Sequence, residues 1–211
     1  MLTTDHIAEL ARLGSSTVYE ADGQAAQVDA DFIRVIPGSR AAGPARTVVC
    51  GQQDNLMVHA AMAGLQEGEV LVLTMPEARP HTLIGDLLAT QAKVRGAAAI
   101  LVDGAIRDVD ELIELGLPVW ARWIRPKGPA KKVVGELDVP VVVGGATIRP
   151  GDILVLDGDG IAVVDPARGE EVLEAALARE QREAVKREKL LAGHLSYDLD
   201  GLRDVVEGAE A

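Results

Sequence analysis

The chain has few aromatic residues, which make up 2% of its 211 residues, although 48% of the residues are hydrophobic. A folded core must therefore be built from Val, Leu, Ile and Ala side chains. There is one cysteine, Cys50, so no disulfide can form within the chain. Because Cys50 ends an apolar run, we expect a buried, inert thiol rather than a nucleophile.

Long apolar runs and an excess of positive charge are also missing. No stretch approaches the roughly 18 apolar residues of a membrane span, and the first residues lack the basic-then-apolar order of a signal peptide. The net charge of −12 argues against nucleic acid as the main ligand, because phosphate binding needs a basic surface. We therefore expect a soluble cytoplasmic protein with no membrane or nucleic-acid partner.

Several common catalytic motifs are absent from the sequence. There is no Gly-x-Ser-x-Gly, no P-loop, no Gly-x-Gly-x-x-Gly and no Cys-x-x-Cys. His59 and His81 have no partner at metal-ligand spacing and are interpreted as core or surface histidines. The run Asp157-Gly158-Asp159-Gly160 lacks the full ligand series of a calcium loop and is interpreted as a hairpin turn.

Hydrophobic periodicity and turn residues predict a layered α/β fold. Helices are expected from Thr4 or Asp5 to Leu13, at 15–21, from Asp54 or Asn55 to about Leu65, at 82–95, near 110–115 and from Glu170 to about Leu191. Strands are expected at 32–36, 45–51, 70–74, 97–102, 118–122, 133–134, 139–143, 153–156 and 161–164. The alternation between residues 70 and 115 indicates a βαβ unit with a parallel strand pair. The closely spaced turns that follow indicate antiparallel hairpins.

The C-terminal part of the chain differs in character from the rest. From Gly169 it becomes a highly charged helix with few apolar positions. Such a helix buries little against its own domain, so it either lies exposed or reaches a neighbouring subunit. We divide the chain into an α/β domain at 1–168 and a helical extension at 169–211.

A cation and an anion lie side by side just past the strongest predicted strand. Residues 97–102 form an unbroken apolar run, Asp103-Gly104 reads as a turn, and Arg107 and Asp108 follow. Ligands of open α/β sheets collect at the carboxyl ends of buried strands. Arg107 offers a planar fork for a carboxylate or keto oxygen, and Asp108 a hard oxygen for a divalent metal. The alternative is an Arg-Asp pair that only caps the next helix.

A second candidate segment is Gly85-Asp86-Leu87-Leu88, near the start of the helix predicted at 82–95. Unpaired N–H groups at a helix start bind carboxylates, and Gly85 permits close approach to the backbone. Asp86 precedes Arg107 by 21 positions, a gap that one helix and one strand fill. The two segments can therefore share one edge of the sheet, although an acid at this position also favours the helix dipole alone.

These motifs resemble the family that joins the RNase E regulator RraA to the class II 4-hydroxy-4-methyl-2-oxoglutarate aldolases. The matching segments are Gly85-Asp86-Leu87-Leu88, Arg95-Gly96, Val102-Asp103-Gly104-Ala105-Ile106-Arg107-Asp108, Pro118-Val119-Trp120-Ala121-Arg122, Pro126-Lys127-Gly128-Pro129 and 150–160. The resemblance implies an RraA-like α/β catalytic domain with a swivelling β/β/α-like core. It also implies a ring-shaped homotrimer. Two such rings can stack into a hexamer.

For the aldolases, the resemblance implies retro-aldol cleavage of a 4-hydroxy-2-oxo acid with release of pyruvate. Substrates would be of the 4-hydroxy-4-methyl-2-oxoglutarate or 4-carboxy-4-hydroxy-2-oxoadipate type, and oxaloacetate decarboxylation is an expected side activity. Mg²⁺ or Mn²⁺ would be held by Asp108, with Glu183 from a neighbour's C-terminal helix in its outer shell, or else Glu180 or Glu188. The remaining implied roles are keto oxygen and enolate binding by Arg107, carboxylate binding by the N–H groups of Leu87 and Leu88, and proton transfer through a water held by Asp86.

The same resemblance leaves a non-enzymatic alternative, a regulator that binds RNase E. The regulators are expected to end near the last β hairpin, so the long C-terminal helix favours the aldolase. A methyltransferase is disfavoured, since no glycine-rich S-adenosylmethionine loop follows a strand. The segment 74–80 departs from the glycine-rich pattern of the family, and its Arg79 either binds a distal carboxylate of the substrate or lies in solvent.

Overall fold

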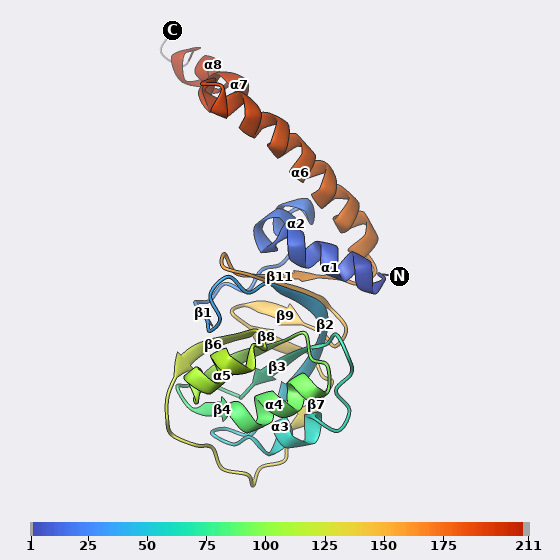
Figure 1. Ribbon diagram of the computed structural model, residues 1–211, viewed down its shortest axis with the longest axis vertical. Helices are drawn as coiled ribbons and strands as arrows, with labels where there is room; N and C mark the ends of the chain where they lie inside the picture. Colours follow the sequence, from blue (N-terminus) through green and yellow to red (C-terminus); the bar gives the residue numbers. More distant parts are fainter. Residues whose placement is uncertain (1, 209–211) are drawn as a thin grey trace.

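The computed structural model describes residues 2–208 as a mixed α/β body from which one long helix extends (Figure 1). The strands of this part are β1 (Ile33–Arg34), β2 (Ala41–Val49), β3 (Val70–Thr74), β4 (Thr82–Ile84), β5 (Ala99–Ile106), β6 (Val119–Ile124), β7 (Glu136–Leu137), β8 (Val141–Val143), β9 (Ala146–Ile148), β10 (Ile153–Leu156) and β11 (Ile161–Val164). The helices are α1 (Thr4–Leu13), α2 (Ser15–Ala21), α3 (Leu56–Ala61), α4 (Asp86–Val94), α5 (Val109–Leu115), α6 (Gly169–Leu191), α7 (Ser196–Leu199) and α8 (Leu202–Glu207).

Most of the strands form one sheet. Its order is β1-β6-β5-β3-β2-β10-β11, with β4 beside β5 and β7 beside β2. The central strands β2, β3, β5 and β6 pair in parallel, whereas β10 pairs antiparallel with both β2 and β11. β8 and β9 form a separate antiparallel hairpin. The predicted parallel pair around α4 and the predicted hairpins are confirmed.

The sheet is buried on both faces, and alternate residues of its central strands point into the layers on opposite sides. On β3, Leu71 and Leu73 join a cluster that includes residues of α3, α4 and α5. Val70 and Val72 join a second cluster, which includes the β8–β9 hairpin. Helices, sheet and hairpin therefore form three layers, as expected for a β/β/α-like core (Figure 1).

The C-terminal helix α6 has a buried beginning and an exposed end. Val172, Leu173 and Ala176 pack into a third cluster with residues of α1, α2, β10 and β11. Glu180 then accepts two hydrogen bonds from Arg12, and no residue of α6 after Ala176 is buried. Figure 1 shows the rest of α6 leaving the body with α7 and α8 at its far end. The expected boundary at residue 168 coincides with the start of the helix, but its first turns belong to the core of the body.

The helix predicted at 82–95 is wrong in its first four residues. Thr82 and Ile84 pair in parallel with β5, and Leu83 is fully buried between neighbouring elements. The hydroxyl of Thr82 also donates to the carbonyl of Arg125 at 2.6 Å. These tertiary contacts hold the segment extended, so the helix begins only at Asp86. The short run Thr-Leu-Ile fits both the helical and the strand periodicity. It forms a strand because the end of β5, beyond its pairing with β3, is available to pair with it.

The turn predicted at Asp103-Gly104 is also wrong, because β5 continues to Ile106. The Asp103 carboxylate accepts a hydrogen bond from Arg122 at 3.2 Å, so its polar group is satisfied inside the sheet. A Cβ on Gly104 would lie 2.9 Å from the terminal methyl of Met75, so a side chain at this strand position would require the flexible end of Met75 to shift. The register against β6 shifts here, as it does at a β-bulge.

Smaller differences concern the ends of elements. The first helix is capped by Thr3 and not by Thr4 or Asp5 as predicted, and the Thr3 side chain accepts from the His6 N–H. The strand expected at 32–36 is reduced to β1, and α3 ends at Ala61. Residues 133–134 form no strand, since β7 begins at Glu136. The strands at 70–74, 153–156 and 161–164 and the helix at 15–21 lie where they were predicted.

Candidate functional site

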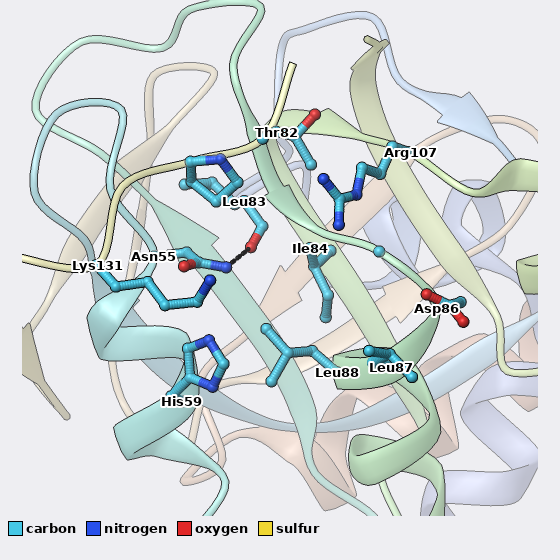
Figure 2. Close-up of a pocket in the computed structure, with 13 residues that line it drawn as sticks. Asn55, His59, Thr82, Leu83, Ile84, Asp86, Leu87, Leu88, Arg107 and Lys131 are labelled. Carbon is cyan, nitrogen blue, oxygen red and sulfur yellow. Dashed lines mark hydrogen bonds between the residues drawn. The ribbon is translucent and has the colours of Figure 1, made fainter. Parts of the chain in front are cut away.

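One cavity of about 160 Å³ opens where the end of β4, the start of α4 and the end of β5 meet. It is lined by Asn55, His59, residues 82–88, Arg107, Gly128, Pro129 and Lys131. Figure 2 shows Arg107 and Asp86 on one side of this cavity and Asn55, His59 and Lys131 on the other. The apolar side chains of Ile84 and Leu88 lie between the two sides.

The unpredicted strand β4 brings Gly85 next to Arg107 and Asp108. The Arg107 N–H donates to the carbonyl of Ile84 at 3.3 Å, which extends the β4–β5 pairing to the end of both strands. A Cβ on Gly85 would lie 2.3 Å from Oδ2 of Asp108 and 3.2 Å from Nε of Arg107. Only glycine leaves room for this arrangement, so the two segments expected to share a sheet edge do so in close contact.

The start of α4 presents unpaired donors to the cavity. Its N-cap, Gly85, makes no side-chain capping bond, and the Asp86 N–H donates to Oδ2 of Asp108 at 3.3 Å. The N–H groups of Leu87 and Leu88 belong to the first turn, where an α-helix provides no acceptor of its own. Free N–H groups and the positive end of the helix dipole together favour an anion at this position.

Arg107 keeps most of its guanidinium free for a ligand. Its Nε contacts Oδ2 of Asp108 at 3.3 Å, and within residues 2–208 this is its only side-chain partner. The side chain is 43% exposed and lines the cavity opposite Lys131. The two terminal nitrogens are therefore available for the paired hydrogen bonds that a carboxylate or keto acid accepts.

Asp108 adopts a left-handed backbone conformation, with φ 58° and ψ 48°. It is the N-cap of α5, yet its side chain makes no capping bond and turns toward Gly85 and Asp86 instead. The alternative that this residue merely caps the following helix is therefore wrong. A non-glycine residue in this region costs roughly 1–2 kcal/mol, and such strain is commonly retained at functional sites.

The residues at this edge suit a weakly held divalent cation rather than a cage of protein ligands. No group of three or more His, Cys, Asp or Glu side chains is arranged for a metal within the chain from residue 2 to 208. Mg²⁺ is often held by one or two carboxylates together with waters and substrate oxygens. Asp108 fits that pattern, because its side chain is 31% exposed and hydrogen bonds from residues 2–208 reach only Oδ2.

Glu183 lies away from this cavity in its own chain. It belongs to the exposed part of α6, where it forms an ion pair with Arg179 of the preceding turn at 2.9 Å. The helix leads away from α4 and α5 in Figure 1, so Glu183 does not approach Asp108 within its own chain. Of the other two glutamates considered, Glu180 is paired with Arg12, and Glu188 is exposed.

Sequence reasoning missed the basic side of the cavity. His59 was interpreted as an isolated histidine, and Lys131 and Asn55 were given no role. Asn55 and His59 are four residues apart at the start of α3, a spacing that places them on one helix face and was a usable signal. Lys131 reaches them through an isolated bridge between Asp54 and Ala130, which no local pattern reveals.

The remaining sequence candidates lie outside the cavity. Burial raises the pKa of the Cys50 thiol to about 12, as expected for an inert buried cysteine. Arg79 pairs with Glu77 at 2.6 Å and lines a different surface hollow, with 60% of its side chain exposed. The predicted turn at 157–160 joins β10 to β11, and the Asp157 carboxylate accepts from the N–H and hydroxyl of Ser15. Within residues 2–208, none of the helices is long and apolar enough to span a membrane.

Comparison with known proteins gives one consistent result. A family model described as RraA-like, Aldolase/RraA, matches residues 15–163. A protein of Halalkalibacterium halodurans named "Putative 4-hydroxy-4-methyl-2-oxoglutarate aldolase" is 35% identical over 153 residues, which cover 72% of each chain. A protein of Ectopseudomonas mendocina with the same name is 39% identical over 117 residues, which cover 56% of this chain and 72% of that one.

A solved structure agrees with the sequence matches. RraAS2 of Streptomyces coelicolor, described as an unusual member of the RNase ES inhibitor RraA protein family, superposes with a TM-score of 0.79 at 30% identity. The superposition covers 88% of this chain and 97% of RraAS2. The matched residues 15–163 contain the whole cavity and the Gly85, Arg107 and Asp108 contacts. The chain therefore belongs to the RraA-like family, which groups aldolases with RraA proteins.

Proposed function

We propose that this protein is a divalent-metal-dependent lyase that cleaves a 4-hydroxy-2-oxo acid and releases pyruvate. The substrate is of the 4-hydroxy-4-methyl-2-oxoglutarate or 4-carboxy-4-hydroxy-2-oxoadipate type, and oxaloacetate decarboxylation is a side reaction. One observation carries the proposal: the Arg107 guanidinium and the uncapped start of α4, both of which line the cavity, lie within hydrogen-bonding distance of the Asp108 carboxylate beside it. The aldolase names of the two relatives support the same reaction class.

The pyruvate end of the substrate binds between the helix start and Arg107. Its carboxylate accepts hydrogen bonds from the N–H groups of Leu87 and Leu88, where the dipole of α4 adds to the attraction. Arg107 donates to the 2-keto oxygen. When the carbon–carbon bond breaks, negative charge develops on that oxygen, so the Arg107 hydrogen bonds strengthen along the reaction.

Asp108 and Asp86 support this chemistry in different ways. Asp108 would hold a divalent ion, with Glu183 of a neighbouring copy in its outer shell, and that ion would supply Lewis-acid polarisation of the keto acid. Asp86 lines the cavity beside Arg107 and orients a water that takes the proton of the 4-hydroxyl group as the carbon–carbon bond breaks and returns a proton to C3 of the enolate. The Arg107–Asp108 contact orients the guanidinium toward the keto oxygen and the developing enolate.

The helical segment after residue 168 provides the contact between subunits in this proposal. From residue 177 to residue 208 it has no buried residue, and Val185 and Leu191 expose 55% and 83% of their surface. A second copy that covers these side chains would also bring its Glu183 to a neighbour. We propose a homotrimer or a hexamer of two such rings, which light scattering on the full chain and on a chain ending at Arg182 would distinguish from a monomer.

A regulator that binds an RNase is the second candidate, and the similarity to RraAS2 favours it. The C-terminal segment does not separate the two candidates. The superposition with RraAS2 covers 88% of this chain, which is more than residues 1–168 alone could supply. The similarity to RraAS2 therefore extends into the C-terminal segment. Capture of an RNase E C-terminal region by this protein would support the regulator.

A coupled assay tests the proposed reaction. A panel of 4-hydroxy-2-oxo acids is offered with Mg²⁺, with Mn²⁺ and without added metal, and pyruvate is followed with lactate dehydrogenase. The proposal expects metal-stimulated pyruvate release from at least one dicarboxylic member of the panel. An enzyme preparation that releases no pyruvate from any of them, although folded and metal-loaded, contradicts it.

A further inference from the structure

We propose that Lys131, together with Asn55 and His59, binds a carboxylate at the distal end of the substrate and so selects dicarboxylic 4-hydroxy-2-oxo acids over those with a neutral end. This inference rests on the proposed function, because it assumes that the 2-oxo acid end lies at Arg107. The two ends of the cavity then have separate tasks, with chemistry at Arg107 and recognition at Lys131.

The segment that carries Lys131 is fastened to the start of α3 on both sides. The N–H of Asn55 donates to the Ala130 carbonyl at 3.0 Å, and the N–H of Ala130 donates to Gln53 at 3.0 Å. Asp54, which is 1% exposed, accepts from the backbone N–H of Lys132 at 2.6 Å. Its other oxygen accepts from the N–H of Leu56 at 2.8 Å. A basic residue on an otherwise irregular segment is thereby held at the cavity wall.

The charges around the cavity differ between its two sides. Among the described lining residues, Asp86 is the one carboxylate, and Figure 2 shows it on the side of Arg107. The far side carries Lys131, His59 and the amide of Asn55. Burial lowers the pKa of His59, and the charge of Lys131 lowers it further, so the two basic groups are close enough to interact. An anion between them would relieve that repulsion.

Asn55 adds an independent sign of a ligand. It is 95% buried and its Nδ2 donates to the Leu83 carbonyl at 2.9 Å, but its Oδ1 has no hydrogen-bond partner among residues 2–208. Buried polar atoms in folded proteins are nearly always paired, and unpaired ones commonly await a ligand or an ordered water. A substrate hydroxyl or the Lys131 ammonium group, drawn in by a bound carboxylate, would supply the donor.

The size of the cavity also fits a ligand longer than pyruvate. A volume of about 160 Å³ holds on the order of ten water-sized groups, so pyruvate alone would leave roughly half of it free. The middle is lined by Ile84 and Leu88, which suit a carbon chain or a methyl substituent. Arg79 was the residue considered for the distal carboxylate, but it lines a different hollow.

Binding measurements on the full chain test this selection. Titration calorimetry with Mg²⁺ present compares 2-oxoglutarate with 2-oxopentanoate, which has the same number of carbons but no distal carboxylate. Lys131→Gln is expected to weaken 2-oxoglutarate by roughly 10- to 100-fold, the range for a hydrogen bond to a charged group. Binding of 2-oxopentanoate should change by less than about 2-fold. Lys132→Gln is the matched control, because Lys132 is adjacent and exposed but lines no part of the cavity.

Each outcome distinguishes this inference from the function on which it rests. Equal binding of 2-oxoglutarate by wild type and Lys131→Gln overturns the distal site and leaves the proposed reaction standing. An equal loss in Lys132→Gln also overturns it, since the effect would then be one of general charge. If the wild type binds neither ligand, the 2-oxo acid site itself fails, and both proposals fail with it.

Discussion

The Asp108 carboxylate occupies the space next to Gly85 where a side chain would begin, and Gly85→Ala perturbs this arrangement directly. The new Cβ would lie 2.3 Å from Oδ2 of Asp108 and 3.1 Å from Cγ of Arg107, whereas ordinary contact begins at 3.4 Å. The carboxylate must therefore move by about 1 Å. The backbone of Gly85, with φ −135° and ψ −165°, is one that alanine adopts freely, so the fold should persist.

The expected cost is kinetic rather than structural. A displacement of about 1 Å in an aligned site can lower the rate by roughly 100-fold, equivalent to about 2.7 kcal/mol on the barrier. We expect kcat/KM for pyruvate release to fall by that factor in Gly85→Ala. The midpoint of thermal unfolding should move by less than about 4 °C, because only a surface contact is disturbed.

Gly208→Ala is the matched control for this substitution. Gly208 has φ −76°, and a Cβ there would meet nothing within 4 Å. We expect its kcat/KM and unfolding temperature to equal those of the wild type. If Gly85→Ala cleaves substrate as fast as the wild type, the contact between Gly85 and Asp108 has no part in catalysis, and the reasoning that links them is refuted.

Two further predictions concern the metal and the fold. Among Glu180→Gln, Glu183→Gln and Glu188→Gln, we expect only Glu183→Gln to weaken the apparent Mg²⁺ affinity, by roughly 10- to 100-fold as for other outer-shell ligands. The affinity is measured from the Mg²⁺ dependence of the rate. Equal effects in all three variants would show that Glu183 has no special place at the metal. Asp54→Asn should lower the free energy of unfolding by roughly 1–3 kcal/mol at pH 7, because backbone N–H groups lose a charged acceptor. Burial alone would raise the pKa of Asp54, but hydrogen bonds from the N–H groups of Leu56, Lys132 and Val133 hold it below the usual 3.8. The stabilisation is therefore complete above pH 3.8 and is lost as the pH falls through the lower pKa of the folded state. The free energies of unfolding of wild type and Asp54→Asn, measured with urea, should therefore converge in acid. A difference between them that grows in acid contradicts the assignment.

The central fold was predictable because its strands are short, unbroken apolar runs. The apolar runs at 70–74 and 97–102 are too short for helices, and each follows a glycine turn, so a parallel pair with a crossover helix was the expected arrangement. Their end positions were not predictable. Whether Thr82–Ile84 extends the sheet or starts the helix depends on a free edge of β5, which is a tertiary property. The Asp103-Gly104 pair misled for the same reason, since Arg122 satisfies Asp103 from a neighbouring strand.

The candidate site was half predictable, and the two halves differ in sequence separation. Asp86 and Arg107 belong to one βαβ unit, whose geometry brings a helix start and a strand end to the same edge. Lys131 reaches Asn55 through a bridge between residues 54 and 130, so its position depends on how the whole chain folds. The left-handed backbone of Asp108 was likewise invisible, because aspartate adopts several conformations after a strand.

The rate of pyruvate release from 4-hydroxy-4-methyl-2-oxoglutarate tests the central claim most directly. It is measured for the wild type and for Arg107→Ala, each with Mg²⁺ and with EDTA. We predict that EDTA abolishes the wild-type activity and that Arg107→Ala loses roughly 100- to 1,000-fold in kcat, the usual cost of removing a donor to a developing oxyanion. Activity that is the same with EDTA, or the same in folded Arg107→Ala, would contradict a metal-dependent lyase built around Arg107 and Asp108.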